Sequence, residues 1–351
     1  MRSTLNGVRI AGISAAVPSH SEEILEGGYL TAEGRKRFVD STGIERRRLA
    51  APDQWCSDFA AAAAERLLDD LGWDRGDIGV LVFVTQTPDM VMPSTACVLQ
   101  HRLGLSNDCA AFDVNLGCSG FAYGLKIAGS ILSETGAQRA LLLVGDTPAK
   151  GVLPSMRNEV PPLFGDAATA TALEYSSGVP EMLFDLKTDG SEWNAICERR
   201  PGGRPGLSAE NFKFEANEVG EVLVGTKHRM RGEDVFNFSV REVPVAVTAM
   251  LEHAGKEKAD IDAFMFHQAN KMINAFIAKR LGLDAEKVPG TLTDFGNTSS
   301  ATIPLTMVHC LRDRLRGDRL SLLLCGFGVG LSWATAYCET DRIVCPELIE
   351  I

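Results

Sequence analysis

The thiol of Cys118 has the neighbours of a reactive cysteine. It lies in Asp113-Val-Asn-Leu-Gly-Cys-Ser-Gly-Phe-Ala-Tyr-Gly124, between the end of an apolar strand pattern and the start of a helical one. Unpaired backbone N–H groups and the positive end of the helix dipole favour a thiolate at such a corner. Most free cysteines are buried and inert, but two glycines and a serine beside this thiol leave room for a substrate. We therefore predict a nucleophile that carries an acyl group as a thioester.

Two further side chains could act on a thioester carbonyl. His267 directly follows the buried strand pattern of residues 261–266, and open α/β sheets bind ligands at the carboxyl ends of their strands. An imidazole there could activate a thiol or stabilise negative charge on a carbonyl oxygen. Asn297 lies in Gly296-Asn-Thr-Ser299, which taken alone is an ordinary polar turn. The late segment Gly326-Phe-Gly-Val-Gly330 could bring backbone N–H groups close to a ligand, although glycines alone are a weak signal.

The composition bounds the class of protein. The chain has 351 residues, 45% of them apolar, so it is long enough for a large core or two domains. Its net charge of −11 argues against nucleic acid as a partner. The nine cysteines include no Cys-x-x-Cys pair, which predicts a reduced, cytoplasmic protein without disulfides or a zinc site. We find no signal-peptide pattern and no apolar run of about 18 residues, so we expect no membrane span.

The elements that must position these side chains occur twice. A helical pattern, a polar turn and a buried strand follow one another over residues 57–85 and again over residues 240–266. The apolar runs at residues 140–146 and 321–327 match each other in the same way. The chain therefore looks like two copies of one α/β unit.

Strands that are apolar throughout are buried on both faces, so helices must cover both sides of the sheets. We accordingly expect an α/β fold with sheets rich in parallel pairs. The join between the copies is expected between Glu174 and Asp189, giving halves of residues 1–180, with the cysteine, and 181–351, with the histidine and asparagine.

Taken together and in this order, four fragments resemble the β-ketoacyl-acyl-carrier-protein synthase III family of the thiolase-like superfamily. They are Asn115-Leu-Gly-Cys-Ser-Gly-Phe121, His267-Gln-Ala-Asn270, Gly296-Asn-Thr-Ser299 and Gly326-Phe-Gly-Val-Gly330. Four shorter fragments add to the resemblance, which covers essentially the whole chain: Thr42-Gly-Ile-Glu-Arg46, Pro93-Ser-Thr-Ala96, Ala111-Phe-Asp113 and Phe164-Gly-Asp166. The resemblance implies a thiolase-like five-layer αβαβα fold built from two pseudo-symmetric halves, and a homodimer.

The resemblance also implies roles for the candidate residues. Cys118 accepts the acyl group of an acyl-CoA or acyl-carrier primer, and His267 and Asn297 polarise the thioester of malonyl-acyl-carrier protein and promote its decarboxylation. The resulting enolate attacks the Cys118 thioester in a Claisen condensation. No metal or redox cofactor is implied, because hydrogen-bond donors stabilise the enolate charge.

The oxyanion hole implied by the family consists of the backbone N–H groups of the nucleophile and of a glycine in the late glycine-rich loop. Here these positions are Cys118 and Val329. A β-branched residue does not readily adopt a positive φ. We therefore expect the conformation of this loop to differ slightly from that of the family.

Three positions are assigned to the substrate pocket: Met92, Phe164 and Gly328. The family places a residue that closes the partner's acyl pocket where Met92 stands, often a phenylalanine. Because methionine is flexible and adaptable, we hypothesise a primer other than acetyl, either longer or branched.

The positions that the family uses to contact CoA or the carrier are altered. Arg37 and Ser41 occupy the places of a tryptophan and an arginine, and Asn158, with Arg157 adjacent, replaces a further arginine. Asn270 is a fourth candidate for this contact. CoA would then be held differently, or the donor would be bound to a carrier, and a specialised pathway gains weight over housekeeping fatty-acid synthesis.

Two alternatives remain open at this stage. The same fold and acyl-enzyme could pass the acyl group to a hydroxyl or an amine, or condense two acyl chains without decarboxylation. In a different class, the chain could be a non-catalytic thiolase-fold partner subunit. The presence of both His267 and Asn297 favours decarboxylative condensation over these alternatives.

Overall fold

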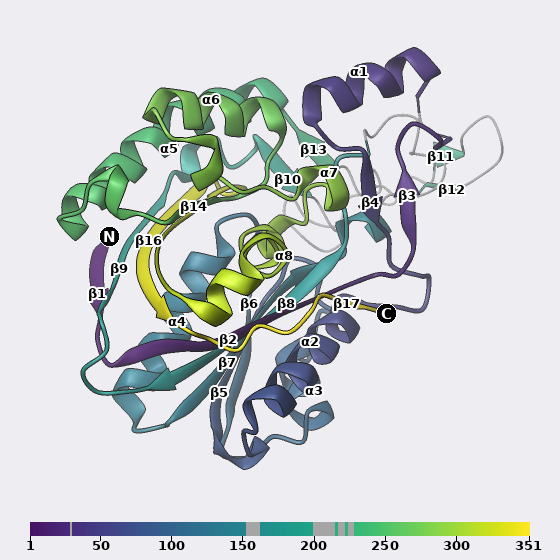
Figure 1. Cartoon of the computed structure of the whole chain (residues 1–351). Helices are drawn as coiled ribbons and strands as arrows, with labels where there is room; N and C mark the ends of the chain where they lie inside the picture. Colours follow the sequence, from purple (N-terminus) through teal and green to yellow (C-terminus); the bar gives the residue numbers. More distant parts are fainter. Residues whose placement is uncertain (29, 152–161, 199–214, 217–221, 224–227) are drawn as a thin grey trace.

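The computed structural model describes residues 1–28, 30–151, 162–198, 215–216, 222–223 and 228–351 (Figure 1). Two large sheets form its framework. The first contains, in spatial order, β17 (Ile349–Glu350), β2 (Val8–Val17), β8 (Ala167–Tyr175), β7 (Arg139–Asp146), β5 (Ile78–Val84) and β6 (Ala110–Val114). The second contains β1 (Arg2–Leu5), β9 (Met182–Thr188), β16 (Ser332–Asp341), β15 (Arg319–Gly328) and β14 (Ala263–Phe266).

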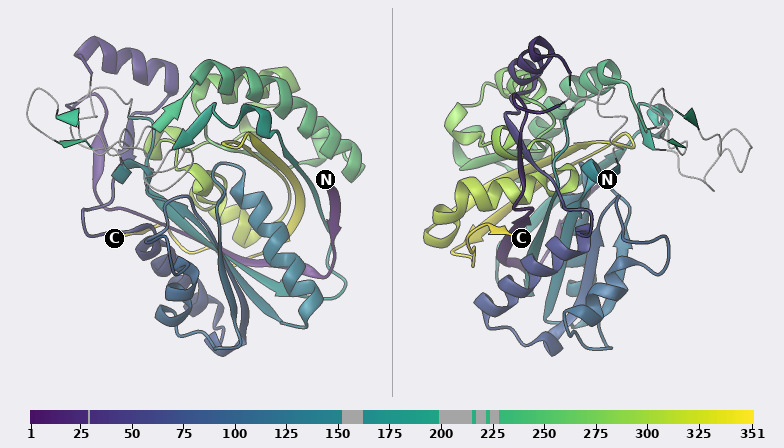
Figure 2. Two further views of the ribbon diagram at one scale, coloured as in Figure 1. Left: turned by 180° about the vertical axis from the view of Figure 1, so that it is seen from behind. Right: turned by 90° about the vertical axis from the view of Figure 1, so that its right-hand side faces the viewer.

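Helices form three layers around these sheets. Between the sheets lie α4 (Gly120–Thr135) and α8 (Thr302–Gly317), each of which contacts strands of both. Outside the first sheet lie α2 (Cys56–Leu71) and α3 (Thr95–Arg102), and outside the second lie α5 (Gly232–Ala254) and α6 (Lys271–Leu281). Both views of Figure 2 place α5 and α6, in green, on the side opposite to α2 and α3, in dark blue. The predicted five-layer αβαβα arrangement is confirmed.

The remaining elements are short and lie away from the two large sheets. They are α1 (Ala32–Thr42), α7 (Leu292–Phe295), the pair β3 (Ser21–Glu23) and β4 (Arg46–Arg48), the pair β10 (Ile196–Glu198) and β13 (His228–Met230), and the pair β11 (Glu215–Ala216) and β12 (Val222–Leu223). Among the described residues, no helix combines the length and apolar character needed to span a membrane.

The prediction of sheets rich in parallel pairs holds for the first sheet, where three of five strand pairs are parallel, and is wrong for the second, where one of four is. β5 pairs in parallel with β6 and β7, and β14 with β15, but β8 runs antiparallel to β2 and β7. β16 is also antiparallel to both of its neighbours, β15 and β9. Only three residues separate β15 from β16, and so short a connection permits only an antiparallel hairpin.

The two ends of the chain cross over between the sheets. β1 pairs with β9 at the edge of the second sheet, whereas β17 pairs with β2 at the edge of the first. Apart from the crossings at the two ends, between β1 and β2 and between β16 and β17, the chain passes from one large sheet to the other between β8 and β9. The division into residues 1–180 and 181–351 stays a prediction. The N-terminal strand β1 belongs to the second sheet and the C-terminal strand β17 to the first, so each sheet includes a strand from the opposite end of the chain.

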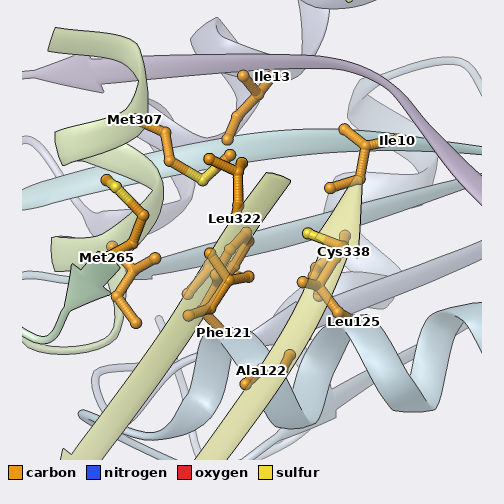
Figure 3. Close-up of a cluster of buried hydrophobic side chains, with 14 of the residues drawn as sticks. Ile10, Ile13, Phe121, Ala122, Leu125, Met265, Met307, Leu322 and Cys338 are labelled. Carbon is orange, nitrogen blue, oxygen red and sulfur yellow. The ribbon is translucent and has the colours of Figure 1, made fainter. Parts of the chain in front are cut away.

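A continuous apolar core surrounds the two middle helices (Figure 3). It combines side chains of both sheets with those of α4 and α8, including Ile10, Ile13, Phe121, Ala122, Leu125, Met265, Met307, Leu322 and Cys338. Burial of each large apolar side chain contributes about 1.5–3 kcal/mol. The first residues of α4 and α8 are thereby held in fixed positions relative to each other, and the candidate site is built there.

Candidate functional site

Cys118 lies at the corner between β6 and α4, with Ser119 as the N-cap of the helix. The end of β15 passes directly against it. A Cβ placed on Gly328 would lie 2.8 Å from the Cys118 sulfur, and one on Gly326 would lie 2.7 Å from the Cys118 carbonyl oxygen. Only glycine permits so close an approach. Gly328, predicted as a pocket residue, therefore borders the thiol.

Burial governs the protonation of this thiol. It raises the pKa of Cys118 to about 11, while hydrogen bonds from the backbone N–H groups of Val329 and of Cys118 itself act in the lowering direction, and the Asp146 carboxylate in the raising one. Our expectation that the helix start favours a thiolate is therefore wrong for the free protein, since desolvation outweighs the local donors. The sulfur is a protonated thiol at neutral pH.

The two backbone N–H groups expected to form an oxyanion hole both face this sulfur. The loop accommodates Val329 because the unusual backbone angles fall on its neighbours, Gly328 with φ +155° and Gly330 with φ +140°. Val329 is not one of the described non-glycine residues with positive φ. The expected distortion at the valine is therefore displaced onto the two glycines.

Two serine hydroxyls tie this loop to the nucleophile. The Ser332 hydroxyl donates to the Val329 carbonyl at 2.8 Å and lies 2.7 Å from the hydroxyl of Ser119, the residue that follows Cys118. Ser119 and Ser332 are both almost fully buried. The pair thereby holds the carbonyl of Val329 at a set distance from the start of α4.

His267 follows β14 and is 1% exposed. Its backbone N–H donates to the Cys325 carbonyl at 2.9 Å, and its Nδ1 lies 2.8 Å from the Thr302 hydroxyl. The ring also packs edge-on against Phe327, with 5.5 Å between the ring centroids. Burial lowers the pKa of His267 to about 3, against a raising contribution from the Ser299 backbone. The imidazole is neutral throughout the physiological pH range.

Asn297 is held by backbone and side chain alike. Its N–H donates to the Leu163 carbonyl at 2.9 Å and its carbonyl accepts from Gly165 N–H at 3.1 Å, which forms the isolated bridge to Phe164. Its Oδ1 accepts the Ser299 N–H at 2.9 Å. Since the oxygen is engaged, the carboxamide has its Nδ2–H groups to offer as donors.

Sequence reasoning missed Asp146, a buried carboxylate at the end of β7. It accepts hydrogen bonds from Gln86 N–H at 2.6 Å, the Thr85 hydroxyl at 3.2 Å and the Ser300 hydroxyl at 2.7 Å. Burial raises the pKa of this carboxyl. It joins the loop after β5 to the turn that carries Asn297. Its position at the end of a buried strand, like that of His267, is the signal that could have revealed it.

The contacts therefore connect the surroundings of the three candidate residues. The end of β15 lies against Cys118 through Gly328, packs edge-on against His267 through Phe327, and is followed by the Val329 N–H group. The turn from Asn297 to Thr302 reaches His267 on one side and Asp146 on the other. A thiol, two backbone donors, a neutral imidazole and a carboxamide can together bind and polarise thioester carbonyls.

The residues predicted to line the acyl pocket occupy different surroundings. Phe164 is half-buried and bridges Asn297, with its carbonyl accepting from Arg47 at 3.0 Å. Met92 is 80% exposed on the loop between β5 and α3, and the neighbouring Val91 is 88% exposed. Within one subunit Met92 therefore lies at the surface rather than in a pocket.

The predicted contacts to CoA or the carrier have local partners of their own. On α1, Arg37 is exposed 3.7 Å from the Glu33 carboxylate, and the Ser41 hydroxyl donates to the Phe38 carbonyl. The Asn270 side chain caps α6 by accepting from Ile273 N–H at 2.8 Å. Arg157 lies outside the described residues. The roles assigned to these four residues stay predictions.

A second buried carboxylate near the site, Asp166, predicts a pH effect on stability. Burial raises the pKa of Asp166 to about 6, despite N–H donors from Ala50 and Ala149. The folded protein therefore holds this proton more tightly than the unfolded chain, so the stability contribution is complete below about pH 4 and is lost as the pH rises through 6. Relative to Asp166→Asn, the wild-type free energy of unfolding should fall by about 2.5 kcal/mol between pH 4 and 7. Urea unfolding of both proteins across this range measures it; parallel pH profiles would contradict it.

Comparison with known proteins gives a consistent picture. Residues 112–190 match the family described as 3-oxoacyl-[acyl-carrier-protein (ACP)] synthase III, and residues 251–340 match its C-terminal counterpart. The beta-ketoacyl-[acyl-carrier-protein] synthase III of Methylococcus capsulatus is 35% identical over 299 residues, 85% of this chain and 88% of that protein.

Solved structures agree. A 3-oxoacyl-(acyl-carrier protein) synthase from Burkholderia xenovorans LB400 superposes with a TM-score of 0.90 at 37% identity, covering 100% of this chain and 99% of the other. The 3-oxoacyl-(acyl carrier protein) synthase III of Pseudomonas aeruginosa PAO1 gives a TM-score of 0.82 at 29% identity, covering 97% and 100% of the two chains.

Proposed function

Because the chain belongs to the 3-oxoacyl-[acyl-carrier-protein] synthase III family, we propose that it is an acyltransferase that primes Cys118 with an acyl group and condenses it with malonyl-acyl-carrier protein. The product is a 3-oxoacyl-carrier protein and the by-product is CO₂. The observation that carries the proposal is the close approach of the end of β15 to the Cys118 sulfur, where a Cβ on Gly328 would lie only 2.8 Å from Sγ and the Val329 N–H group follows.

In the first half-reaction, the Cys118 sulfur attacks the thioester carbonyl of an acyl-CoA or acyl-carrier primer. The N–H groups of Cys118 and Val329 receive the charge that develops on the carbonyl oxygen. The C–S bond to the leaving thiol breaks, and the thiol proton ends on that departing group. Because the pKa of the free Cys118 thiol is about 11, this proton must leave in step with the attack.

In the second half-reaction, malonyl-carrier protein loses CO₂ and leaves an enolate. The Asn297 amide and the neutral His267 imidazole donate hydrogen bonds to the enolate oxygen. Donors that are held in place before the reaction stabilise the negative charge that develops on this oxygen. The enolate carbon attacks the Cys118 thioester, the C–S bond breaks, and water returns a proton to the thiolate. This chemistry asks for no metal or redox cofactor.

We propose in addition that the protein acts as a homodimer in which the loop bearing Met92 reaches the partner subunit. The loop exposes three consecutive apolar side chains, Met90 at 42%, Val91 at 88% and Met92 at 80%. Exposed apolar clusters of this kind favour burial against another surface.

A flexible methionine at the floor of an acyl pocket suits a primer longer than acetyl or branched. Nine free thiols fit the reducing cytoplasm that we propose as its compartment.

The test follows both half-reactions. The protein is incubated with acyl-CoAs of two to twelve carbons (roughly the span of short primers) and analysed by intact mass and peptide mapping; malonyl-carrier protein is then added and CO₂ and 3-oxoacyl product are counted. We expect one acyl group on Cys118, best with a primer other than acetyl, and CO₂ equal to product. Transfer to a hydroxyl or amine without CO₂ release, or labelling of another cysteine, would overturn the proposed function. Strict acetyl preference would overturn only the choice of primer.

A further inference from the structure

Thr302, the first residue of α8, contacts the imidazole of His267 through its side-chain hydroxyl. Its hydroxyl lies 2.8 Å from Nδ1 of His267, and both side chains are only 1% exposed. The same hydroxyl is also placed to donate to the Ser299 carbonyl at 3.0 Å, and this carbonyl is a possible acceptor for a ring N–H of His267 as well. A hydroxyl has one hydrogen to donate, so it can donate to the ring nitrogen or to the carbonyl, but not to both at once.

This choice decides which ring nitrogen of His267 carries the proton. If Thr302 donates to the Ser299 carbonyl, Nδ1 must be the N–H that donates to the hydroxyl, and Nε2 is left without hydrogen. If Thr302 donates to Nδ1, the hydrogen of the neutral ring is on Nε2. A charged ring with both hydrogens is disfavoured, because burial lowers the pKa of His267 to about 3.

We propose that Thr302 is a positioning residue whose hydroxyl donates to Nδ1 of His267 and thereby keeps the N–H on Nε2. The inference rests on the proposed function, since a neutral imidazole whose Nδ1 is occupied by Thr302 can donate to an enolate oxygen only from Nε2. The Ser299 carbonyl also accepts the backbone N–H of Thr302 in the turn Ser299–Ala301, so it keeps a partner when the hydroxyl donates to Nδ1.

The surroundings hold Thr302 and Asn297 in one unit. Ser299 has a left-handed backbone with φ +53°, and its N–H donates to Asn297 Oδ1 at 2.9 Å. The next residue, Ser300, donates its hydroxyl to the buried Asp146 carboxylate at 2.7 Å. One short turn therefore sets both donors of the second half-reaction: the amide of Asn297 directly, and the imidazole through Thr302.

The test compares Thr302→Val with Thr302→Ser. Valine keeps the shape and removes the hydroxyl, so the N–H should move to Nδ1, facing the Ser299 carbonyl. We expect acylation of Cys118 within about twofold of wild type but CO₂ release and condensation reduced about 10²–10³-fold, the usual effect of losing one donor to a developing oxyanion. Serine should restore condensation to within a few-fold. A purely structural role would lower both half-reactions together.

A direct readout is the ¹⁵N NMR spectrum of the histidine rings, in which protonated and unprotonated nitrogens are resolved. The signals of His267, one of six histidines, are assigned by their absence from a His267→Asn protein. Wild type should show N–H on Nε2 and Thr302→Val on Nδ1. The matched control is Thr306→Val, one turn further along α8, whose buried hydroxyl contacts Thr302 O and Thr291 rather than the ring; it should leave tautomer and rates unchanged.

The outcomes separate the two proposals. Wild-type protein that releases no CO₂ from malonyl-carrier protein overturns the proposed function, whatever the tautomer. Wild-type protein that condenses normally, with Nδ1 protonated or with Thr302→Val equally active, overturns the role of Thr302 alone.

Discussion

Replacing Cys118 by alanine should abolish acyl-enzyme formation and lower condensation by about 10⁴-fold or more, since the proposed reaction forms its thioester on the Cys118 sulfur. Alanine removes only the sulfur, whose pKa the backbone N–H groups of Val329 and of residue 118 lower. The fold should therefore persist. Intact mass after incubation with acyl-CoA, together with the rate of 3-oxoacyl formation, measures the effect.

The same variant should separate the two half-reactions. His267 and Asn297 remain in place, so Cys118→Ala should still release CO₂ from malonyl-carrier protein without forming a new C–C bond. The matched control is Cys310→Ala, which removes an exposed thiol on α8 and should retain wild-type rates. An acyl adduct that survives in Cys118→Ala but disappears in Cys310→Ala would show that Cys310 is the acylated residue, and would refute the assignment of Cys118 as the nucleophile.

Gly328→Ala should have the second largest effect, through geometry alone. The new Cβ would lie 2.8 Å from both Cβ and Sγ of Cys118, at a residue whose φ of +155° is rarely adopted by other amino acids. Either the thiol or the Val329 N–H group must move. Loss of one oxyanion donor costs about 10²–10³-fold in kcat, and the backbone strain costs about 1–3 kcal/mol of stability.

Steady-state kinetics and urea unfolding distinguish these two consequences. The control is Gly317→Ala at the end of α8, where a Cβ meets open space; it should change neither kcat nor stability appreciably. If Gly328→Ala keeps wild-type kcat while folding normally, the Val329 N–H group has no part in holding the oxyanion.

Local patterns predicted the placement of the candidate site well. Cys118 at a strand-to-helix corner and His267 at the end of a buried strand follow from the apolar runs that precede them. Asn297 needed the resemblance, because its turn is ordinary by itself. The layers followed from strands buried on both faces. Whether the strands pair in parallel or antiparallel could not be predicted in the same way. For β8 and β16 the direction depends on their partner strands and, for β16, on the short turn at Val329.

A sequence pattern does not show how deeply a side chain is buried or which distant residues it contacts. The helix start at Cys118 predicted a thiolate, but burial dominates its pKa. The two-residue strand β17 and the four-residue strand β1 escaped notice because only their partners, β2 and β9, make them strands. Asp146 and Thr302 likewise acquire meaning only from what lies within hydrogen-bond reach of them.

A sulfur that keeps its hydrogen has a consequence for the resting protein. With a pKa of about 11, only about one molecule in ten thousand carries the thiolate at pH 7. Peroxide and alkylating agents attack the anion, so a thiol with this pKa should react with them more slowly than a cysteine held as a thiolate. The thiol would then lose its proton only when an acyl substrate is bound and attacked, and would stay protonated the rest of the time.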